Sequence, residues 1–378
     1  WSMGITHHTF GVDNVQAIVN LALMRGMVGK KYAGLLPLRG HSNVQGIGSM
    51  GVTPQLKQAV LDNLQSKFPV ILPTKPGLDT LACVESANKK EIDFAFNLGG
   101  NLYGSNPDSQ FTQMSLGKIG FSLFLNTTLN QGHFLGRGQN SLILPVLARD
   151  EEPEPTTQES MFSFIRLSDG GFKRYSGPRS EVKIIAEIAQ RVIGSNELPW
   201  ESLSYTGNIR EIISRIIPGF EQLKNIDQTG KEFHIDKRIL HTPRFSLPDG
   251  KASFKVCPIP AVRGNKRNCF TLMTIRSEGQ FNTVVYEPDD RYRKVTTRNV
   301  VLMNKKDIKM IGLNQGDIVR VKNNTGIMTG QKLQAFPIKP GNIMMYYPES
   351  NILVPRQFDP QSKTPSFKSI EVFLEKQS

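Results

Sequence analysis

The chain has 378 residues, of which 38% are hydrophobic, and it contains 33 glycines and 23 prolines. This length can form two or three domains with buried cores, and apolar stretches such as 119–125 are too short to span a bilayer. A formal net charge of +13 would suit nucleic acid, but the basic residues are scattered among acidic ones. We interpret them first as a solvated surface, second as a pocket for a polyanionic small molecule, and third as a nucleic-acid groove.

Cysteine and histidine spacing limits the metal chemistry that these residues can provide. The three cysteines, Cys83, Cys257 and Cys269, lie far apart and form no CxxC pair, and the six histidines form no HExxH motif. We therefore expect no metal ligated by this part of the protein, a cytoplasmic location, and chemistry that depends on a cofactor. Because the chain opens on Trp1 without a signal segment, we also expect it to be part of a longer protein.

The first 150 residues alternate helical and strand patterns. Helices are predicted from Asp13, as N-cap, to a stop at Gly26, from a start at Thr53-Pro54, and over 78–88. Strands are predicted over 92–98 and 121–125. Helices between short apolar strands indicate an α/β domain with a largely parallel sheet.

The middle of the chain is less regular. Residues 149–160 are acidic and proline-bearing, which predicts a surface connection. A helix is predicted over 181–193, with Ser180 as its N-cap and Gly194 as its stop. Residues 205–265 are interpreted as loop-rich.

From Asn268 the pattern becomes β. Strands are predicted over 270–275, 318–322, 327–335 and 342–347, with a short helix over 305–311 and a hairpin turn at 323–326. We interpret this last region, about 110 residues long, as a compact barrel domain.

The most unusual segment for chemistry is 39–51, with the sequence RGHSNVQGIGSMG. Its glycines cannot form a packed core element and suit a backbone that passes close to a ligand. Arg39 offers a planar fork for an anionic group. Composition alone favours the alternative, an ordinary glycine-rich loop.

Two strand ends carry similar alternatives. The 92–98 strand runs into Gly99-Gly100-Asn101, where an open α/β sheet usually presents a ligand site, although the GxGxxG fingerprint is absent and a tight turn is the other reading. In the barrel, the polar segments 276–282 and 348–351 either hold a phosphate and a purine edge or are solvated turns.

Taken in order, these segments resemble a known family. The series is WSMGITHH (1–8), PLRG (37–40), NVQG (43–46), NLGGN (97–101), NTT (126–128), SMFSFIRLSDGG (160–171), RSEGQFN (276–282), GLNQGDIVRV (312–321) and KTPSFK (363–368). It is similar to formate dehydrogenases that carry molybdopterin guanine dinucleotide, a branch of the molybdopterin-dependent oxidoreductases. The resemblance covers nearly the whole chain.

The resemblance implies an architecture. It predicts an α/β, dinucleotide-binding-like region with a parallel sheet, followed by a six-stranded double-psi-like β-barrel. The expected domains are the end of an upstream α/β domain (1–39), an α/β cofactor-binding domain (40–150), a mixed region shared with an N-terminal half (151–265), and the dinucleotide-binding barrel (266–378).

It also implies a cofactor and its contacts. The cofactor is molybdenum or tungsten chelated by two molybdopterin guanine dinucleotides. Arg39 matches the active-site arginine, and His41 lies beside it as the second expected catalytic residue. The expected cofactor-binding residues are Thr6, His7, Gln45, Gly46, Gly99, Gly100, Asn101, Asn126, Arg276, Ser277, Gln280, Phe281, Asn282, Glu349, Ser350, Asn351 and Lys368.

The implied activity is two-electron redox of a small anionic substrate, with electrons leaving through an upstream 4Fe-4S cluster toward an electron-transfer partner protein. The metal ligand and the cluster cysteines would lie upstream of Trp1, so this chain alone would be inactive. The family usually has Gln-Asn where this chain has His41-Ser42, which leaves formate a candidate only. The alternatives are a reductase of another small substrate and, in a different class, a basic nucleic-acid-binding module.

Overall fold

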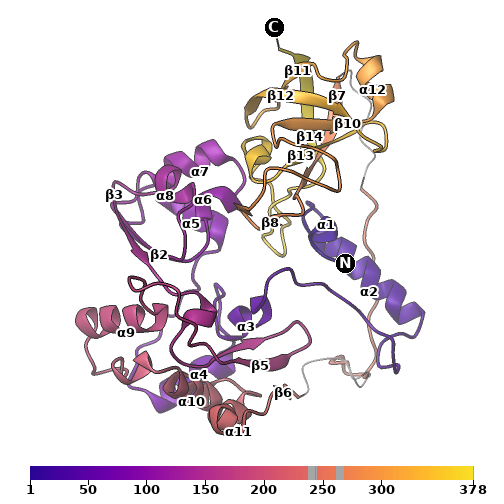
Figure 1. The fold of residues 1–378 in the computed structure, drawn as a ribbon. Helices are drawn as coiled ribbons and strands as arrows, with labels where there is room; N and C mark the ends of the chain where they lie inside the picture. Colours follow the sequence, from indigo (N-terminus) through magenta and orange to yellow (C-terminus); the bar gives the residue numbers. More distant parts are fainter. Residues whose placement is uncertain (237–242, 244, 261–267, 378) are drawn as a thin grey trace.

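The computed structural model describes residues 1–236, 243, 245–260 and 268–377. Figure 1 shows an α/β unit and a region of short helices and strands below it, with the β-barrel at the other end of the molecule. An N-terminal arm of two helices, α1 (Met3–Thr6) and α2 (Gly11–Met24), lies beside the barrel. Among the described residues, no helix is both long and apolar enough to cross a bilayer.

The α/β unit is built on a three-stranded parallel sheet in the order β1-β2-β3. Its strands are β1 (Phe94–Leu98), β2 (Phe121–Asn126) and β3 (Asn140–Pro145). Helices α5 (Thr80–Asn88) and α7 (Ser109–Leu116) pack on one face, where Ala87 and Leu116 form a buried cluster with Ala95 of β1. The predicted α/β region with a parallel sheet is confirmed.

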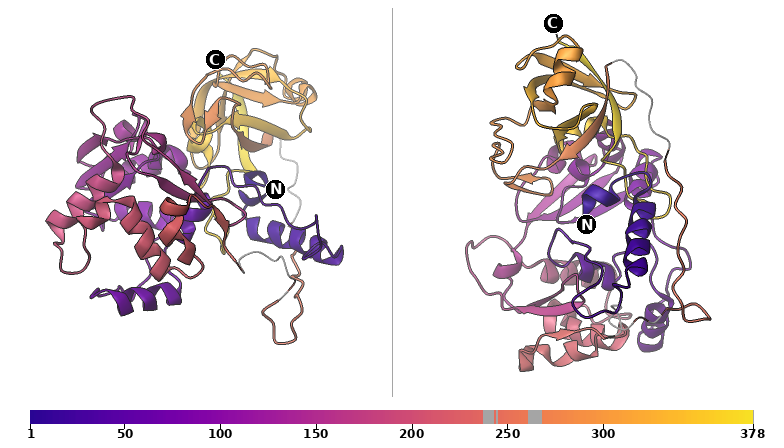
Figure 2. Two further views of the ribbon diagram at one scale, coloured as in Figure 1. Left: turned by 60° about the horizontal axis from the view of Figure 1, so that its bottom comes forward. Right: turned by 90° about the vertical axis from the view of Figure 1, so that its right-hand side faces the viewer.

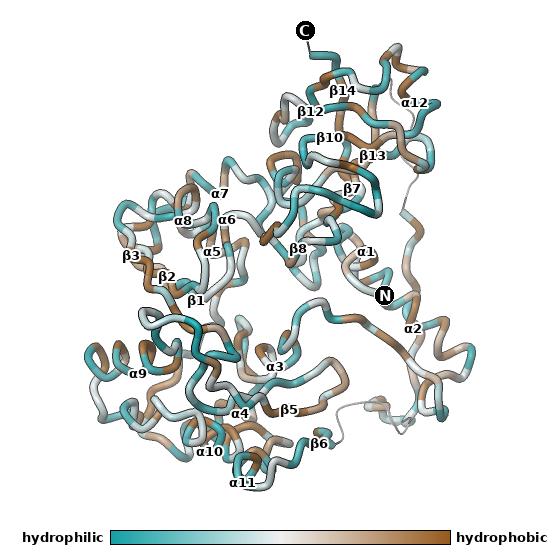
Figure 3. The backbone as a smooth tube through the Cα atoms, in the orientation of Figure 1, coloured by the Kyte–Doolittle hydropathy of each residue, from teal (hydrophilic) through white to brown (hydrophobic). Residues whose placement is uncertain are grey.

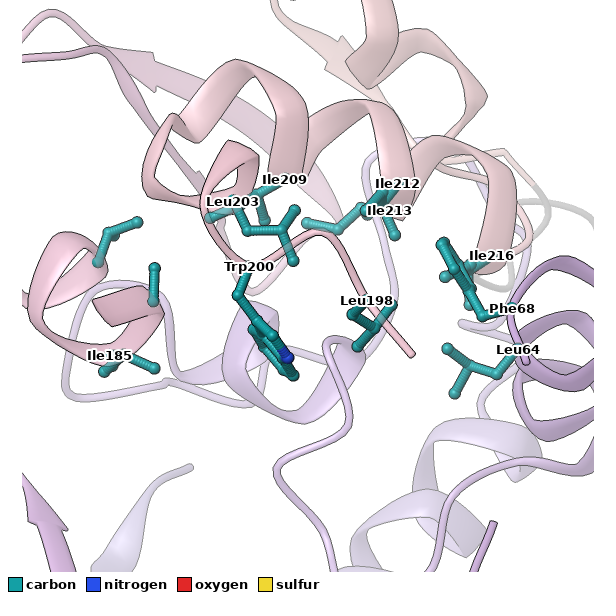
Figure 4. A pocket seen from close by; sticks show the side chains of 12 residues that line it. Leu64, Phe68, Ile185, Leu198, Trp200, Leu203, Ile209, Ile212, Ile213 and Ile216 are labelled. Atoms are coloured by element: carbon teal, nitrogen blue, oxygen red, sulfur yellow. The ribbon is translucent and has the colours of Figure 1, made fainter. Parts of the chain in front are cut away.

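The region below the sheet combines helices with a small antiparallel sheet. Its elements are α3 (Val44–Ser49), α4 (Gln58–Lys67), β4 (Thr156–Glu159), β5 (Phe164–Ser168), α9 (Glu181–Val192), α10 (Thr206–Ile216), α11 (Ile226–Thr229) and β6 (Phe233–His234). Ile165, Phe220 and Ile226 are buried together at its centre. Between α4, α9 and α10 lies an apolar cavity of about 300 Å³, with Leu64, Trp200 and Ile213 among its lining residues (Figure 4).

The C-terminal domain is a closed barrel in the strand order β10-β12-β11-β14-β7-β13. Its strands are β7 (Cys269–Ile275), β10 (Val300–Met303), β11 (Ile318–Lys322), β12 (Ile327–Ala335), β13 (Asn342–Tyr346) and β14 (Ile370–Lys376). Burial alternates along β11, where Val319 and Val321 are buried and Arg320 is exposed, as a strand with one face on a core requires. The predicted six-stranded barrel is confirmed.

The barrel domain contains further elements outside the six strands. They are a short hairpin of β8 (Gln280–Phe281) and β9 (Val284–Val285), the helix α12 (Lys305–Met310) and the 3-10 helix η4 (Glu349–Leu353). The predicted hairpin turn at 323–326 is present, since the Asn323 N–H donates to the Gly326 carbonyl at 3.0 Å between antiparallel β11 and β12.

The barrel is bonded to both of its neighbours. The Lys368 N–H donates to the His7 carbonyl at 3.0 Å, and the Val12 N–H donates to a carboxylate oxygen of Asp359 at 3.0 Å. On the other side, Asn351 donates through its side-chain amide to the carbonyl of Gly104 at 2.9 Å, in α6 (Leu102–Ser105). The segment 251–260, which follows a turn at 246–250, runs beside α2, where the Asn20 side chain bonds the backbone of Lys255 (Figure 2).

Two helix starts were predicted wrongly. Helix α2 begins at Gly11 with Phe10 at its N-cap, so Asp13 lies inside the first turn, where its charge still suits the helix dipole. Helix α4 begins at Gln58 rather than at Thr53-Pro54, because Lys57 is extended and occupies the N-cap. The ends of α2 and α9 agree with their predicted glycine stops, since Gly26 and Gly194 have positive φ angles.

Three segments carry more structure than predicted. Residues 149–160 are not a plain surface connection, because they form η1 (Arg149–Glu151) and β4 and bury the side chains of Glu151, Glu152 and Glu159. Residues 205–236 are not loop-rich, because α10 and α11 cross them. The glycine-rich segment 39–51 contains a short helix, α3, in which Gly46 is buried while Ile47 and Gly48 are exposed. The predicted domain boundary at 265/266 lies outside the described residues, and the domain division stays a prediction.

Candidate functional site

A cavity of about 530 Å³ lies where the barrel, the N-terminal arm, the 39–51 segment and α6 meet. Five of the expected site residues line it, namely His7, His41, Arg276, Asn282 and Lys368. They are spread over more than 360 positions of the sequence, so only the fold brings them together. Among the lining residues that the structure describes there is no carboxylate.

Arg276, directly after β7, provides one of the cationic groups of this cavity. Its guanidinium donates to the side-chain carbonyl of Asn282 at 3.1 Å and lies 5.1 Å from the centre of the Tyr347 ring. The Tyr347 hydroxyl donates to the same Asn282 oxygen at 3.1 Å. Burial raises the pKa of Tyr347 to about 12, so this hydroxyl keeps its proton. Arg276 is thus oriented without a neutralising carboxylate.

Lys368 and His7 form the second part of the cavity wall. The Lys368 ammonium donates to the backbone carbonyl of Thr274. Burial, together with the charges of Arg276 and Arg293, lowers the pKa of Lys368 to about 8. Burial and the neighbouring Lys368 lower the pKa of His7 to about 4, so His7 is neutral at pH 7 while most Lys368 side chains are charged.

His41 is placed against the barrel by an aromatic contact. Its ring lies edge-on to Phe281 with a centroid distance of 4.2 Å, and its Nδ1 is buried without a hydrogen-bond partner among the described residues. Burial, and then the charge of Arg276, lower the pKa of His41, which leaves the imidazole neutral at pH 7. Arg39 lies two residues away but outside the lining, and its guanidinium donates to the Gln45 side chain at 3.0 Å.

The two polar segments after β7 and β13, 276–282 and 348–351, are held together by Arg298, a residue that the sequence analysis did not single out. The Arg298 guanidinium donates to Ser277 Oγ at 2.9 Å, to the Tyr347 carbonyl at 2.7 Å and to Gln280 Oε1 at 3.2 Å. It also forms an ion pair with both carboxylate oxygens of Glu349. Glu349 therefore neutralises Arg298, and no motif in the segment around Arg298 would have marked it.

A neighbouring arginine has a carboxylate partner of its own. Arg293 pairs with Asp290, which also accepts a hydrogen bond from the Tyr346 hydroxyl at 2.8 Å. Among the described residues, Arg276 and Lys368 are thus the cations of this region that have no carboxylate partner.

The other expected group lies at the carboxyl end of the parallel sheet. Gly99 and Gly100 both have positive φ angles, and the Gly100 carbonyl accepts from the Asn126 amide at 3.1 Å. Asn101 caps α6 by accepting from the Gly104 N–H at 2.8 Å. Asn126 Oδ1 is buried and has no hydrogen-bond partner within the described chain. Helix α6 ends at Ser105, which lines the cavity, so it connects the two groups.

The remaining expected residues lie outside the lining. Gly46 is buried in α3, where an added Cβ would meet Asn43 Oδ1 at 1.9 Å, and Ser350 is fully buried with its hydroxyl bonded to the Tyr346 carbonyl at 2.7 Å. Thr6 ends α1, and Gln45 contacts Arg39. Asn351 bonds α6 and keeps a buried, unpartnered Oδ1.

Comparison with known proteins adds relatives of this chain. Residues 270–371 match the family model described as molydopterin dinucleotide binding domain. An uncharacterized oxidoreductase of Mycobacterium tuberculosis is 33% identical over 99% of this chain and 50% of its own length. Protein YdeP of Escherichia coli is 32% identical over 99% of this chain and 52% of its own length.

More distant similarities have more specific names. The F420-dependent formate dehydrogenase subunit alpha of Methanocaldococcus jannaschii is 25% identical over 100% of this chain and 58% of its own length. The solved structure of acetylene hydratase from Pelobacter acetylenicus superposes with a TM-score of 0.59 at 15% identity, covering 80% of this chain and 47% of that one, which supports the fold alone.

The chain spans about half the length of the curated relatives it matches. Its barrel matches the dinucleotide-binding domain over 270–371, and its relatives include both uncharacterized oxidoreductases and formate dehydrogenase alpha subunits. The C-terminal barrel is therefore a molydopterin dinucleotide-binding domain over residues 270–371.

Proposed function

We propose that this chain binds bis(molybdopterin guanine dinucleotide) with molybdenum or tungsten, within an enzyme that carries out two-electron redox of a small anionic substrate. The observation that carries the proposal is the cationic cavity beside the barrel. Arg276 and Lys368 face it without carboxylate partners, whereas Arg293 and Arg298 nearby are each paired. A polyanionic ligand offers the charge that these two side chains lack.

The residues present fit such a ligand in a second respect. The side-chain oxygens of Asn126 and Asn351 are buried and unpartnered among the described residues. Buried acceptors are normally hydrogen-bonded, so each calls for a donor group, and a guanine base offers N–H donors. Asn126 lies at the sheet end and Asn351 at the barrel, the two places where the family resemblance expects nucleotides.

When bound, the metal cofactor would supply the two-electron chemistry. The chain's own residues have supporting roles. Arg276 and Lys368 hold negative charge, and Arg39 offers a fork of donors to an anionic substrate. His41 remains a neutral imidazole at the cavity wall, able to donate or accept one hydrogen bond while Phe281 holds its ring. Electrons would pass to a 4Fe-4S cluster in polypeptide outside this chain and on to a partner protein.

Formate is the first candidate substrate, because the relatives include formate dehydrogenase alpha subunits. His41-Ser42 departs from the family pattern beside Arg39, so a reductase of another small substrate is the alternative. A turnover screen with formate and a dye acceptor separates them. Formate-dependent dye reduction supports the first, and turnover of another small substrate without formate oxidation supports the second.

The cofactor itself is tested on the protein purified from its source. Elemental analysis should find molybdenum or tungsten, and oxidation of the extract should release a fluorescent pterin. Replacing both Arg276 and Lys368 with methionine should lower the pterin content per protein, while the matched change of the exposed Arg320 should not. Purified wild-type protein that is free of metal and pterin would overturn the proposal.

A further inference from the structure

Arg149 lies at the carboxyl end of the parallel sheet and reaches across to the 39–51 segment. It begins η1, a few residues after β3 ends at Pro145. Its guanidinium donates to Gln158 Oε1 on β4 at 2.5 Å and to Ser42 Oγ at 3.4 Å. The chain between β3 and β5, most of which is hydrophilic in Figure 3, thus contacts the segment that carries Arg39. Ligands of open parallel sheets usually bind outside the carboxyl ends of the strands.

Arg149 forms no ion pair with a carboxylate among the described residues. The other arginines between positions 149 and 180 each have such a partner, in the pairs Arg166–Glu232, Arg174–Asp150 and Arg179–Glu187. Asp150 follows Arg149 in the chain, but both of its oxygens accept hydrogen bonds from Arg174. Gln158, which holds Arg149, is neutral, so it orients the guanidinium and leaves its positive charge uncompensated.

Arg39 has the same kind of environment. Its guanidinium donates to Gln45 Oε1 at 3.0 Å, and within the described chain it too forms no ion pair. Both arginines are exposed to solvent. The chain from Arg39 to Ser42, which Arg149 contacts, spans at most about 11 Å. Two uncompensated guanidinium groups, each held by a glutamine side chain, therefore meet at one short stretch of chain.

Other bonds hold β4 against this stretch without Arg149. The Glu159 N–H donates to Asn43 Oδ1 at 3.0 Å, and Ser49 Oγ donates to the Glu159 carboxylate at 2.5 Å. Glu159 is buried, whereas Arg149 is exposed and its bond to Ser42 is long. A structural role alone therefore leaves the unpaired charge of Arg149 unexplained.

The fork geometry of arginine limits what one residue can bind. One guanidinium holds one carboxylate through two parallel N–H···O bonds. An anion with a single carboxylate, such as formate, would be satisfied by Arg39 alone. The second guanidinium offers a further fork of donors, which suits a second anionic group on the same molecule.

We propose that Arg149 is a specificity-determining residue that works together with Arg39, and that the substrate carries two anionic groups, one for each arginine. The inference rests on the proposed function, because that function takes Arg39 as the group that receives the substrate. It deepens that function by favouring a small dianion over formate. Arg149 does not line the cationic cavity of Arg276 and Lys368, so the two charged sites are separate.

Calorimetric titration of the full-length protein, purified from its source, tests the role of Arg149. The probes are formate, with one carboxylate, and oxalate and malonate, with two. At least one dicarboxylate should bind the wild-type protein more tightly than formate does. Arg149→Met should weaken that binding roughly tenfold or more, the effect of losing a hydrogen bond to a charged group, and should change formate binding little.

Gln158→Glu separates the charge of Arg149 from its structural contacts. The carboxylate supplies the ion-pair partner that Arg149 lacks and leaves the guanidinium in place. If the uncompensated charge binds the anion, this variant should lose dicarboxylate affinity as Arg149→Met does. If Arg149 only joins β4 to Ser42, the stronger bond should leave anion binding unchanged. Gln113→Glu adds the same charge at an exposed position of α7 and should behave as the wild type.

Any of four results would overturn the inference. They are dicarboxylate binding by the wild type no tighter than formate binding, wild-type affinity in Arg149→Met, a loss in Arg149→Met without a loss in Gln158→Glu, and a loss of formate affinity as large as that of the dicarboxylate. The metal and pterin content of the same preparations tests the proposed function separately, because the titrations measure binding and not turnover.

Discussion

Arg298 donates to both carboxylate oxygens of Glu349, and the same guanidinium binds Ser277 and the carbonyl of Tyr347. Arg298 is only 9% exposed. Its donors therefore tie the loop after β7 to the turn after β13, the two segments that the sequence marks as cofactor contacts. The Arg298 contacts to Ser277 and to the Tyr347 carbonyl therefore help to position Arg276 and Tyr347, which line the cavity. Arg298 itself does not line it.

Replacing Arg298 with methionine should destabilise the barrel. Removing one partner of a buried ion pair costs roughly 3–5 kcal/mol because the other charge is left without compensation. Glu349 is 29% exposed, which places the expected loss at or below the lower end of that range. Urea denaturation followed by circular dichroism measures the change.

The matched control is Arg320→Met. Arg320 pairs with Glu375 on the barrel surface, where the two side chains are 47% and 35% exposed, so the expected loss is about 0–1 kcal/mol. Equal losses in the two variants would show that the Arg298 pair contributes no more than a surface pair.

Much of the barrel was predictable because its strands alternate. The predicted strands 318–322 and 327–335 have the same bounds as β11 and β12. Alternating apolar and polar residues predict a strand with one face on a core, so this pattern is easy to recognise. Strand β10 (VVLM) escaped prediction because all four of its residues are buried, which removes the alternation. Residues 205–236 were misread although Ile209, Ile212, Ile213 and Ile216 of α10 repeat at helical spacing.

The site was predictable only where a motif marks it. His7, Arg276 and Lys368 were expected from the family resemblance, and the fold brings them to one cavity. Arg298 has no motif, and its role follows from burial and from partners about 20 to 50 positions away. The acidic segment 149–160 was mispredicted for the opposite reason, because its charges predict exposure. Glu159 is nevertheless buried, where its carboxylate accepts a hydrogen bond from Ser49 Oγ and its N–H donates to the side-chain oxygen of Asn43.

Gly46 should tolerate no side chain, because the side chain of Asn43 occupies the space that a Cβ would need. An alanine Cβ there would lie 1.9 Å from Asn43 Oδ1, which accepts a hydrogen bond from the Glu159 N–H at 3.0 Å. Gly46→Ala should therefore break this bond between α3 and β4 and lower the melting temperature. Gly48→Ala, two residues on, meets nothing within 4 Å and should be neutral or slightly stabilising, since alanine favours a helix. Differential scanning fluorimetry compares the two, and equal melting temperatures would contradict the packing argument.

Arg39→Lys should separate catalysis from cofactor loading. Arg39 is exposed and lies outside the cavity lining, so its loss should leave pterin content unchanged. Lysine keeps the charge but cannot reproduce the planar fork, so turnover should fall by about a hundredfold or more, the range seen when one donor to a developing anion is lost. Pterin content and dye-linked turnover are measured on the same preparation. Normal turnover would remove Arg39 from the catalytic role.

Anion binding at the cavity should depend on pH through Lys368. Its pKa is lowered to about 8, so the ammonium is charged below that pH and is lost as the pH rises through it. Affinity for sulfate, whose own charge is constant over this range, should therefore fall between pH 7 and pH 9. Calorimetric titration of protein freed of its cofactor measures the trend.

Two lysine variants test whether Lys368 causes that fall. Lys368→Met should bind sulfate weakly at both pH values, because the missing ammonium no longer titrates. Lys363→Met changes a lysine of the same loop whose ammonium lies over the Phe358 ring outside the cavity, so it should keep the wild-type pH dependence. His7 and His41 have lowered pKa values and stay neutral throughout this range, so neither can produce the effect. An unchanged fall in Lys368→Met would assign the titration to another group and remove Lys368 from the anion site.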